Sequence, residues 1–94
     1  MARLLIYKNQ ELNGVVVLLD KQLKDSSGNT YYSGATLEKP GSSKLELISS
    51  TDERIINSKQ HHSYLYPYLK NVKDRQVLGN NLLDFYQRNK GFLK

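Results

Sequence analysis

The stretch LLIYKNQELNGVVVLL, residues 4–19, holds two short apolar runs on either side of a polar segment. The runs, Leu4–Tyr7 and Val15–Leu19, are continuous and aliphatic or β-branched, a pattern typical of strands that are covered on both faces. Asn13 and Gly14 close the polar segment and tolerate the positive φ values that turns need. The stretch therefore predicts an antiparallel hairpin with a longer loop, whose strands are central in a sheet.

The rest of the first half alternates turn signals with short strand patterns. DSSGN, residues 25–29, is a run of five turn-forming residues and marks a chain reversal. TYY, residues 30–32, and ATLEK, residues 35–39, are interpreted as two short strands separated by Ser33 and Gly34. Pro40 and Gly41 suit the central positions of the turn that follows.

KLELIS, residues 44–49, alternates charged and apolar residues. Leu45 and Leu47 fall on one face, whereas Lys44, Glu46 and Ile48 fall on the other, which is the pattern of a half-exposed strand. With this segment the first half predicts about five strands.

The second half predicts two or three helices. Ser50 and Glu53 fit a capping box for a helix that runs to about Gln60. A second helix is favoured from about Tyr66, because Pro67 would then lie in its first turn and Leu65, Leu69 and Val72 would form one stripe. A strand over residues 63–69 is the alternative, with Pro67 forcing it to an edge of the sheet.

A final helix is indicated by an apolar stripe with Asp74 as its cap and Gly91 just past its end. The stripe consists of Val77, Leu78, Leu82, Phe85 and Tyr86. Gly79–Asn81 are poor helix formers that could kink or split this helix. The order of the elements, with strands in the first half and helices in the second, predicts a single α+β domain over residues 1–94. The helices are expected to pack on one face of a small, mainly antiparallel sheet.

Composition narrows the class of protein. Seven Tyr and two Phe without Trp make a lean core for 94 residues, and the chain has no Cys, which rules out disulfides and thiolate metal sites. A domain of this size without disulfides is more typical of cytoplasmic proteins than of secreted ones. No stretch approaches the roughly 18 apolar residues of a membrane span, so no membrane association is expected.

The formal charge of +5 is concentrated in the second half. Through Glu53 the chain carries six basic and seven acidic residues, whereas from Arg54 onward it carries eight basic and two acidic ones. Such a basic half attracts anionic partners, either nucleic acid or an acidic protein surface.

No motif indicates an enzyme. His61 and His62 are adjacent and point in different directions on a helix or a strand, so they do not predict a metal site, and no cofactor is expected. A small metal-free ribonuclease that uses His61, His62, Tyr64, Lys70 and Arg75 is the catalytic alternative, although no spacing distinguishes it from a contact surface.

Basic and aromatic residues interleave in HHSYLYPYLKNVK, residues 61–73, and around it. Lysine and arginine neutralise phosphates and tyrosine rings stack on unpaired bases, as in RNA and single-strand binders. The predicted binding residues are Lys59, Tyr64, Tyr66, Tyr68, Lys70, Lys73, Arg75, Arg88 and Lys90.

The leading hypothesis is a noncatalytic binding protein whose basic half docks nucleic acid on one side of the fold. The alternative is a protein-interaction module, such as an inhibitor, adaptor or assembly subunit of a virus or mobile element. Open sheet edges and a tyrosine-rich patch favour this alternative, and it is compatible with a homo-oligomer.

Overall fold

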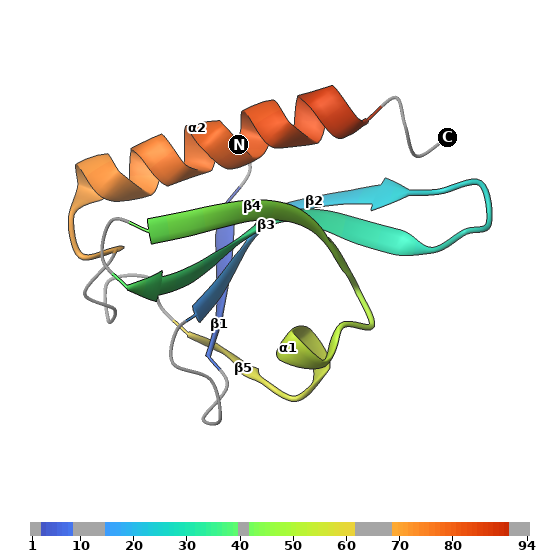
Figure 1. The fold of residues 1–94 in the computed structure, drawn as a ribbon, viewed down its shortest axis with the longest axis horizontal. Helices are drawn as coiled ribbons and strands as arrows, with labels where there is room; N and C mark the ends of the chain where they lie inside the picture. The colour runs from blue at the N-terminus through green and yellow to red at the C-terminus, as the bar shows by residue number, and fades with distance from the viewer. Residues whose placement is uncertain (1–2, 9–14, 40–41, 62–68, 91–94) are drawn as a thin grey trace.

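The computed structural model describes residues 3–8, 15–39, 42–61 and 69–90 (Figure 1). In chain order the elements are β1 (Leu4–Lys8), β2 (Val15–Lys24), β3 (Thr30–Lys39), β4 (Ser42–Ser49), α1 (Glu53–Ile56), β5 (Lys59–His61) and α2 (Val72–Asn89). The expected α+β class is confirmed.

The strands form one antiparallel sheet in the order β4-β3-β2-β1-β5. The first four strands follow one another as a meander, and β1 and β2 pair as the opening stretch predicts. After β4 the chain crosses one face of the sheet, carries α1 there, and returns to pair β5 with β1 at the opposite edge. Among the described strands, β4 and β5 therefore lie at the two edges of the sheet.

The β2–β3 hairpin bends and extends beyond the rest of the sheet (Figure 1). The pairing register of β2 with β3 shifts between Leu18 and Gln22, where β2 holds more residues than β3, and such bulges bend a strand. The predicted reversal lies at the tip of this hairpin. There the Asp25 carboxylate accepts hydrogen bonds from the backbone N–H groups of Ser27 and Asn29 at 2.9 and 2.8 Å, and Gly28 adopts a φ of 87°.

The helices lie on opposite faces of the sheet, so the expectation that they share one face is wrong. We call the side against which α2 packs the α2 face, and its buried residues are Ile6, Val15, Val17, Leu19, Ala35, Leu37, Leu69, Leu78 and Leu82. The other side, the α1 face, buries Leu5, Val16, Leu18 and Ile48, with Ile55 of α1 packed against them. Strands buried on both faces explain the continuous apolar runs.

β3 is one continuous strand, whereas the sequence predicts two strands separated by Ser33 and Gly34. Both residues fit the strand for packing reasons. Ser33 is fully buried on the α2 face, and its hydroxyl donates a 2.7 Å hydrogen bond to the carbonyl of Leu82 in α2. At Gly34 a β-carbon would overlap the Ile48 side chain and lie 2.9 Å from Leu18, so the α1 face needs glycine there.

The helix predicted from Ser50 to about Gln60 is shortened to the four residues of α1. Its N-cap is Asp52, whose carboxylate accepts a 2.8 Å bond from the Arg54 N–H, and not Ser50. With only Ile55 and Ile56 as strong apolar residues, a longer helix would bury little surface. Residues 59–61 instead gain backbone pairing with β1 as β5.

A single helix, α2, occupies residues 72–89 and continues through Gly79–Asn81. Asn71 caps it by accepting a 2.8 Å bond from the Lys73 N–H, so Asp74 lies inside the first turn and is not the cap. Leu78 and Leu82 are buried as predicted, but Val77 is 51% exposed. The helix predicted from Tyr66 begins outside the described residues, and its stripe is not formed, because Leu69 is buried and Val72 is 56% exposed.

Candidate functional site

The predicted basic residues lie at both ends of α2 and on β5. Lys70 and Lys73 are exposed at the start of the helix, and Arg88 and Lys90 are exposed at its end. At roughly 1.5 Å per residue, Lys73 and Lys90 are about 25 Å apart along the helix axis. Lys59 belongs to β5, opposite Lys8 of β1. The described cations therefore form separate groups rather than one row.

Arg75 has a structural role. It is only partly exposed, and its Nη1 donates to the backbone carbonyls of Leu69 and Lys70 at 2.8 and 3.3 Å. These bonds hold the segment before α2 against the first turn of the helix, next to the buried Leu69 side chain. A guanidinium engaged in this way has fewer donors left for a phosphate.

Tyr64, Tyr66 and Tyr68 lie outside the described residues, as does His62. The predicted stacking role of the three tyrosines stays a prediction. The aromatic residues that the structure does place near exposed cations are Phe85 and Tyr86 of α2.

A cluster of cations surrounds these two rings, and we call it the Tyr86 cluster: Lys21, Phe85, Tyr86, Arg88 and Lys90. The ammonium groups of Lys21 and Lys90 lie 5.4 and 6.0 Å from the centre of the Tyr86 ring. The Arg88 guanidinium lies 5.9 Å from the centre of the Phe85 ring. These distances are in the range of cation–π contacts, which hold the charged groups near the rings.

Two distant parts of the chain build the Tyr86 cluster. Tyr86 packs against the core of the α2 face, which fixes its ring beside the sheet. Lys21 comes from β2, within the segment where the register with β3 shifts. Sequence reasoning missed three residues of the cluster. Phe85 and Tyr86 are interpreted as part of the apolar stripe of the last helix, and Lys21 lies 65 positions before Tyr86, where no local pattern marks it.

The positive charges of the Tyr86 cluster are only partly compensated. Arg88 forms a 3.1 Å ion pair with Asp84, one turn earlier on α2, and both side chains are more than 60% exposed. Such exposed pairs contribute little to stability and leave the arginine accessible. Within the ranges that the structure describes, Lys21 and Lys90 form no ion pair.

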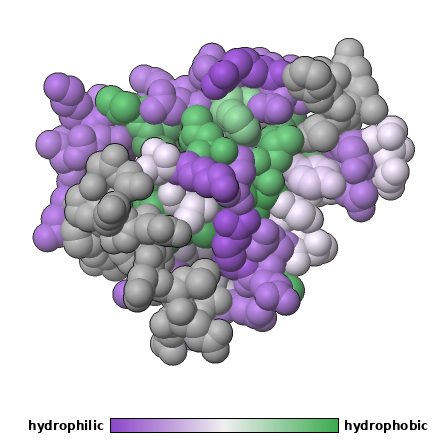
Figure 2. Space-filling model, in the orientation of Figure 1, coloured by the Kyte–Doolittle hydropathy of each residue, from purple (hydrophilic) through white to green (hydrophobic). Residues whose placement is uncertain are grey.

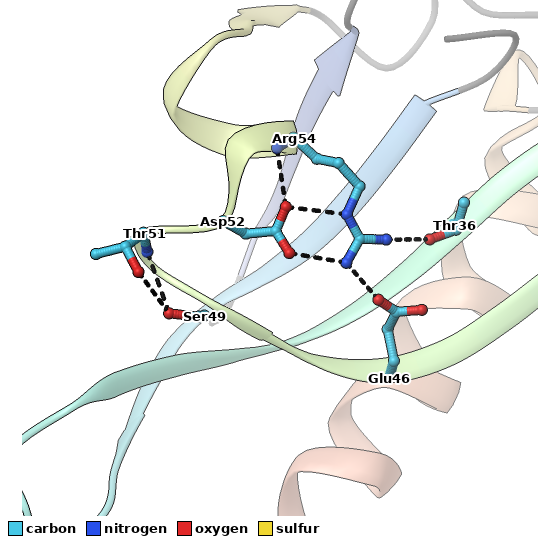
Figure 3. Close-up of polar contacts among 6 residues, drawn as sticks. All are labelled: Thr36, Glu46, Ser49, Thr51, Asp52 and Arg54. Atoms are coloured by element: carbon cyan, nitrogen blue, oxygen red, sulfur yellow. Dashed lines mark hydrogen bonds and ion pairs between the residues drawn. The ribbon is translucent and has the colours of Figure 1, made fainter.

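Arg54, by contrast, is neutralised within the fold (Figure 3). Its guanidinium bonds to both carboxylate oxygens of Asp52 at 3.0 and 2.9 Å, to Glu46 of β4 at 2.5 Å and to the Thr36 hydroxyl of β3 at 3.2 Å. These contacts tie α1 to the two strands at the β4 edge. The basic second half thus loses one of its eight cations to carboxylates nearby.

The charges in this group shift one another's protonation. The hydrogen bond from the Arg54 side chain holds the pKa of Asp52 below its ordinary value near 3.8, and the Asp52 carboxylate in turn raises the pKa of Arg54. Both groups are therefore charged at neutral pH. Their arrangement is that of a structural ion-pair network, which stabilises the position of α1.

Of the residues of the ribonuclease alternative, the structure describes only His61, Lys70 and Arg75, so this alternative stays a prediction. His61 lies in β5 opposite Ile6, and Arg75 is bound to backbone carbonyls. Across residues 3–8, 15–39, 42–61 and 69–90, no group of three His, Cys, Asp or Glu residues is placed to hold a metal ion. None of the helices in those ranges is both long and apolar enough to span a membrane.

Comparison of the chain with known protein families, with curated proteins and with solved structures found no match.

Proposed function

We propose that this is a noncatalytic binding protein that docks nucleic acid at the Tyr86 cluster. The observation that carries the proposal is the convergence of Lys21 from β2 and Lys90 from the end of α2 on one aromatic ring. The two ammonium groups lie 5.4 and 6.0 Å from the centre of the same ring, so one extended anionic chain that passes this ring could contact both. A nucleic-acid partner also agrees with the cytoplasmic location expected from the sequence.

The cluster supplies the two kinds of contact that flexible nucleic acids offer. Lys21, Lys90 and Arg88 are exposed and suit phosphate oxygens, and the arginine fork can bind two of them at once. Phe85 and Tyr86 remain partly exposed beside these cations. Rings beside cations favour a single-stranded partner, whose unpaired bases can stack, over a fully paired duplex.

The matched test compares two double variants with the same charge loss. Lys21→Gln/Lys90→Gln removes both lysines of the cluster. Lys24→Gln/Lys73→Gln removes one lysine from the same strand and one from the same helix, but Lys24 lies on the α1 face and Lys73 lies at the other end of α2. Binding of a fluorescent single-stranded RNA and DNA oligonucleotide is measured by anisotropy.

Each lysine that contacts a phosphate contributes about tenfold to affinity at about 50 mM salt. The cluster variant is therefore expected to bind up to about a hundredfold more weakly than the wild type, while the control variant binds nearly as well. Equal losses in the two variants would show that net charge alone attracts the nucleic acid. Absence of binding by the wild type at low salt would refute the proposal.

The second candidate function is a protein-interaction module, and a different observation favours it. β4 is a terminal strand of the sheet, and one of its edges has no partner strand in the described part of the chain. A partner that is recovered from cell extract after nuclease treatment, and that is lost when β4 is altered, would support this candidate.

A further inference from the structure

The outer edge of β4 is a long stretch of backbone with which no other described strand pairs. β4 spans eight residues at one end of the sheet order, and among the described elements only β3 pairs with it (Figure 1). Proteins normally block such edges, because another strand can add to them. The question is which strand fits this edge.

The hydrogen bonds of β4 show which of its backbone groups face outward. Ser50 N–H donates to the Thr30 carbonyl at 2.9 Å, which makes Ser50 and Thr30 a hydrogen-bonded pair in the β3–β4 register. Since antiparallel pairs alternate along a strand, the even-numbered residues of β4 bond to β3. Leu45 and Leu47 therefore direct their N–H and C=O groups to the open edge. The register shifts next to Ser43, but the extra residue lies in β3 and β4 continues without a break, so we infer the same direction for Ser43.

The side chains of β4 carry a charge pattern that is complementary to itself. Lys44 and Glu46 lie on the same face, one on each side of Leu45. If a second β4 runs antiparallel with Leu45 opposite Leu45, each Lys44 lies opposite the Glu46 of the other copy. These two positions are non-hydrogen-bonded pairs, in which opposite Cα atoms approach to about 4.5 Å and side chains interact most closely.

Neighbouring registers are unfavourable for the same reason. Moving the second strand by two residues in one direction places Lys44 opposite Lys44, and in the other direction it places Glu46 opposite Glu46. Like charges directly opposite each other destabilise a strand pair. The charges on β4 thus select one register of self-pairing.

Glu46 is held in position for this contact. One of its carboxylate oxygens accepts a bond from Arg54, and within the described residues the other oxygen has no hydrogen-bond partner (Figure 3). A carboxylate can accept several bonds, so the pairing with Arg54 leaves room for a lysine. Lys44 is exposed, and no ion pair is found for it in the same ranges.

Apolar surface lies beside the same edge. Leu45 is partly buried and packs against the core of the α2 face, and Leu47 is also partly exposed. Figure 2 shows hydrophobic residues gathered between the polar outer side of α2 and β4. A second strand at this edge would bring Leu45 against its own copy and cover part of this surface.

We propose that this chain forms a dimer in which the β4 strands of the two copies pair in antiparallel orientation, with Leu45 opposite Leu45. The two five-stranded sheets then join into one continuous sheet about a two-fold axis that passes through the interface. Because the two-fold axis is perpendicular to the sheet, the α2 faces of both copies lie on the same side.

The experiment is sedimentation equilibrium of the full chain over a range of concentrations, with two pairs of variants. Ser43→Pro removes an outward N–H that the interface uses, and Ser43→Ala is its control. Ser43 is exposed, and proline is tolerated at an edge position whose N–H faces solvent. Lys44→Glu places two carboxylates opposite each other, and Lys44→Ala removes the attraction without adding repulsion.

The wild type and Ser43→Ala are expected to reach twice the 10.8 kDa mass of one chain. Ser43→Pro and Lys44→Glu are expected to raise the dissociation constant by about tenfold or more, and Lys44→Ala by less. Circular dichroism verifies that each variant is folded. If Ser43→Pro unfolds, the dissociation constant of Lys44→Glu alone tests the proposal. A wild type that stays monomeric, or a dimer that Lys44→Glu leaves unchanged, would overturn the proposal.

Discussion

Ser33 and Gly34 are neighbours in β3, and each is fitted to a different face of the sheet. The Ser33 hydroxyl bonds to α2 on one side, whereas the absence of a side chain at Gly34 admits Ile48 and Leu18 on the other. In a sequence both residues indicate a turn. Their place in a strand follows from what packs above and below them, which is tertiary information that a local pattern does not contain.

Two glycine substitutions should change stability in opposite directions. Gly34→Ala forces a methyl group against Ile48 and Leu18 and should cost about 1–3 kcal/mol. Gly79→Ala places its methyl group in open space on α2 and should stabilise the protein by about 0.5–1 kcal/mol, because glycine is a poor helix former. Urea denaturation of both variants measures the free energies of unfolding, and a Gly34→Ala variant as stable as the wild type would contradict the packing described for β3.

The Asp52 carboxylate should make stability depend on pH in the acid range. Its pKa is lower in the folded chain than its ordinary value near 3.8, so its contribution is present above about pH 4 and is lost as pH falls through the folded pKa. Solvent screening limits the contribution to about 1 kcal/mol or less.

Asp52→Asn preserves a capping side chain but removes the charge, which makes it the matched variant for this effect. The difference in unfolding free energy between wild type and variant should shrink between pH 5 and pH 2. A difference that stays constant over this range would mean that the Asp52–Arg54 pairing does not stabilise the fold.

Among the elements, the apolar runs were the most reliable guide. β1 and β2 pair as LLIY and VVVLL predict. Continuous aliphatic runs require burial on both faces of the sheet, and α1 and α2 pack on these two faces. The extent of α1 could not be predicted. Residues 59–61 have no strong strand pattern and become β5 because the edge of β1 is available to them.

The contact between β3 and α2 is testable through Ser33. Ser33→Ala removes the 2.7 Å bond to the Leu82 carbonyl and should destabilise the protein by about 1 kcal/mol. Leu82→Ala removes most of a fully buried side chain of α2 and should lower the free energy of unfolding by about 2–5 kcal/mol. Thermal unfolding followed by circular dichroism ranks the two, and an unchanged midpoint for Leu82→Ala would contradict the packing of α2 on the sheet.

At the scale of the whole molecule, the charge of the second half does not indicate where the cations lie in the fold. Arg54 and Arg75 are engaged in structural contacts, Lys73 and Lys90 lie at opposite ends of α2, and Lys21 joins from the first half. Only the folding of β2 beside the end of α2 creates the Tyr86 cluster. Summed charge therefore does not predict which cations lie together in the fold.

The two proposals reinforce each other without depending on each other. Self-pairing of β4 would place two copies of α2, each with its Tyr86 cluster, on one side of a continuous sheet. Two linked sites bind a long anionic chain more tightly than either alone, because the second contact becomes intramolecular. Lys44→Glu should therefore weaken binding of a long oligonucleotide more than binding of a short one. Equal losses for both lengths would show that dimerisation does not contribute to nucleic-acid binding.

The salt dependence of nucleic-acid binding tests the role of Lys21 and Lys90 most directly. The logarithm of the binding constant is measured against the logarithm of salt concentration for the wild type and for Lys21→Gln/Lys90→Gln. If both lysines neutralise phosphates, the slope of the variant should be shallower by about 1.5–2, whereas the slope of Lys24→Gln/Lys73→Gln should match the wild type. A cluster variant whose slope equals that of the wild type would contradict nucleic-acid docking at this surface.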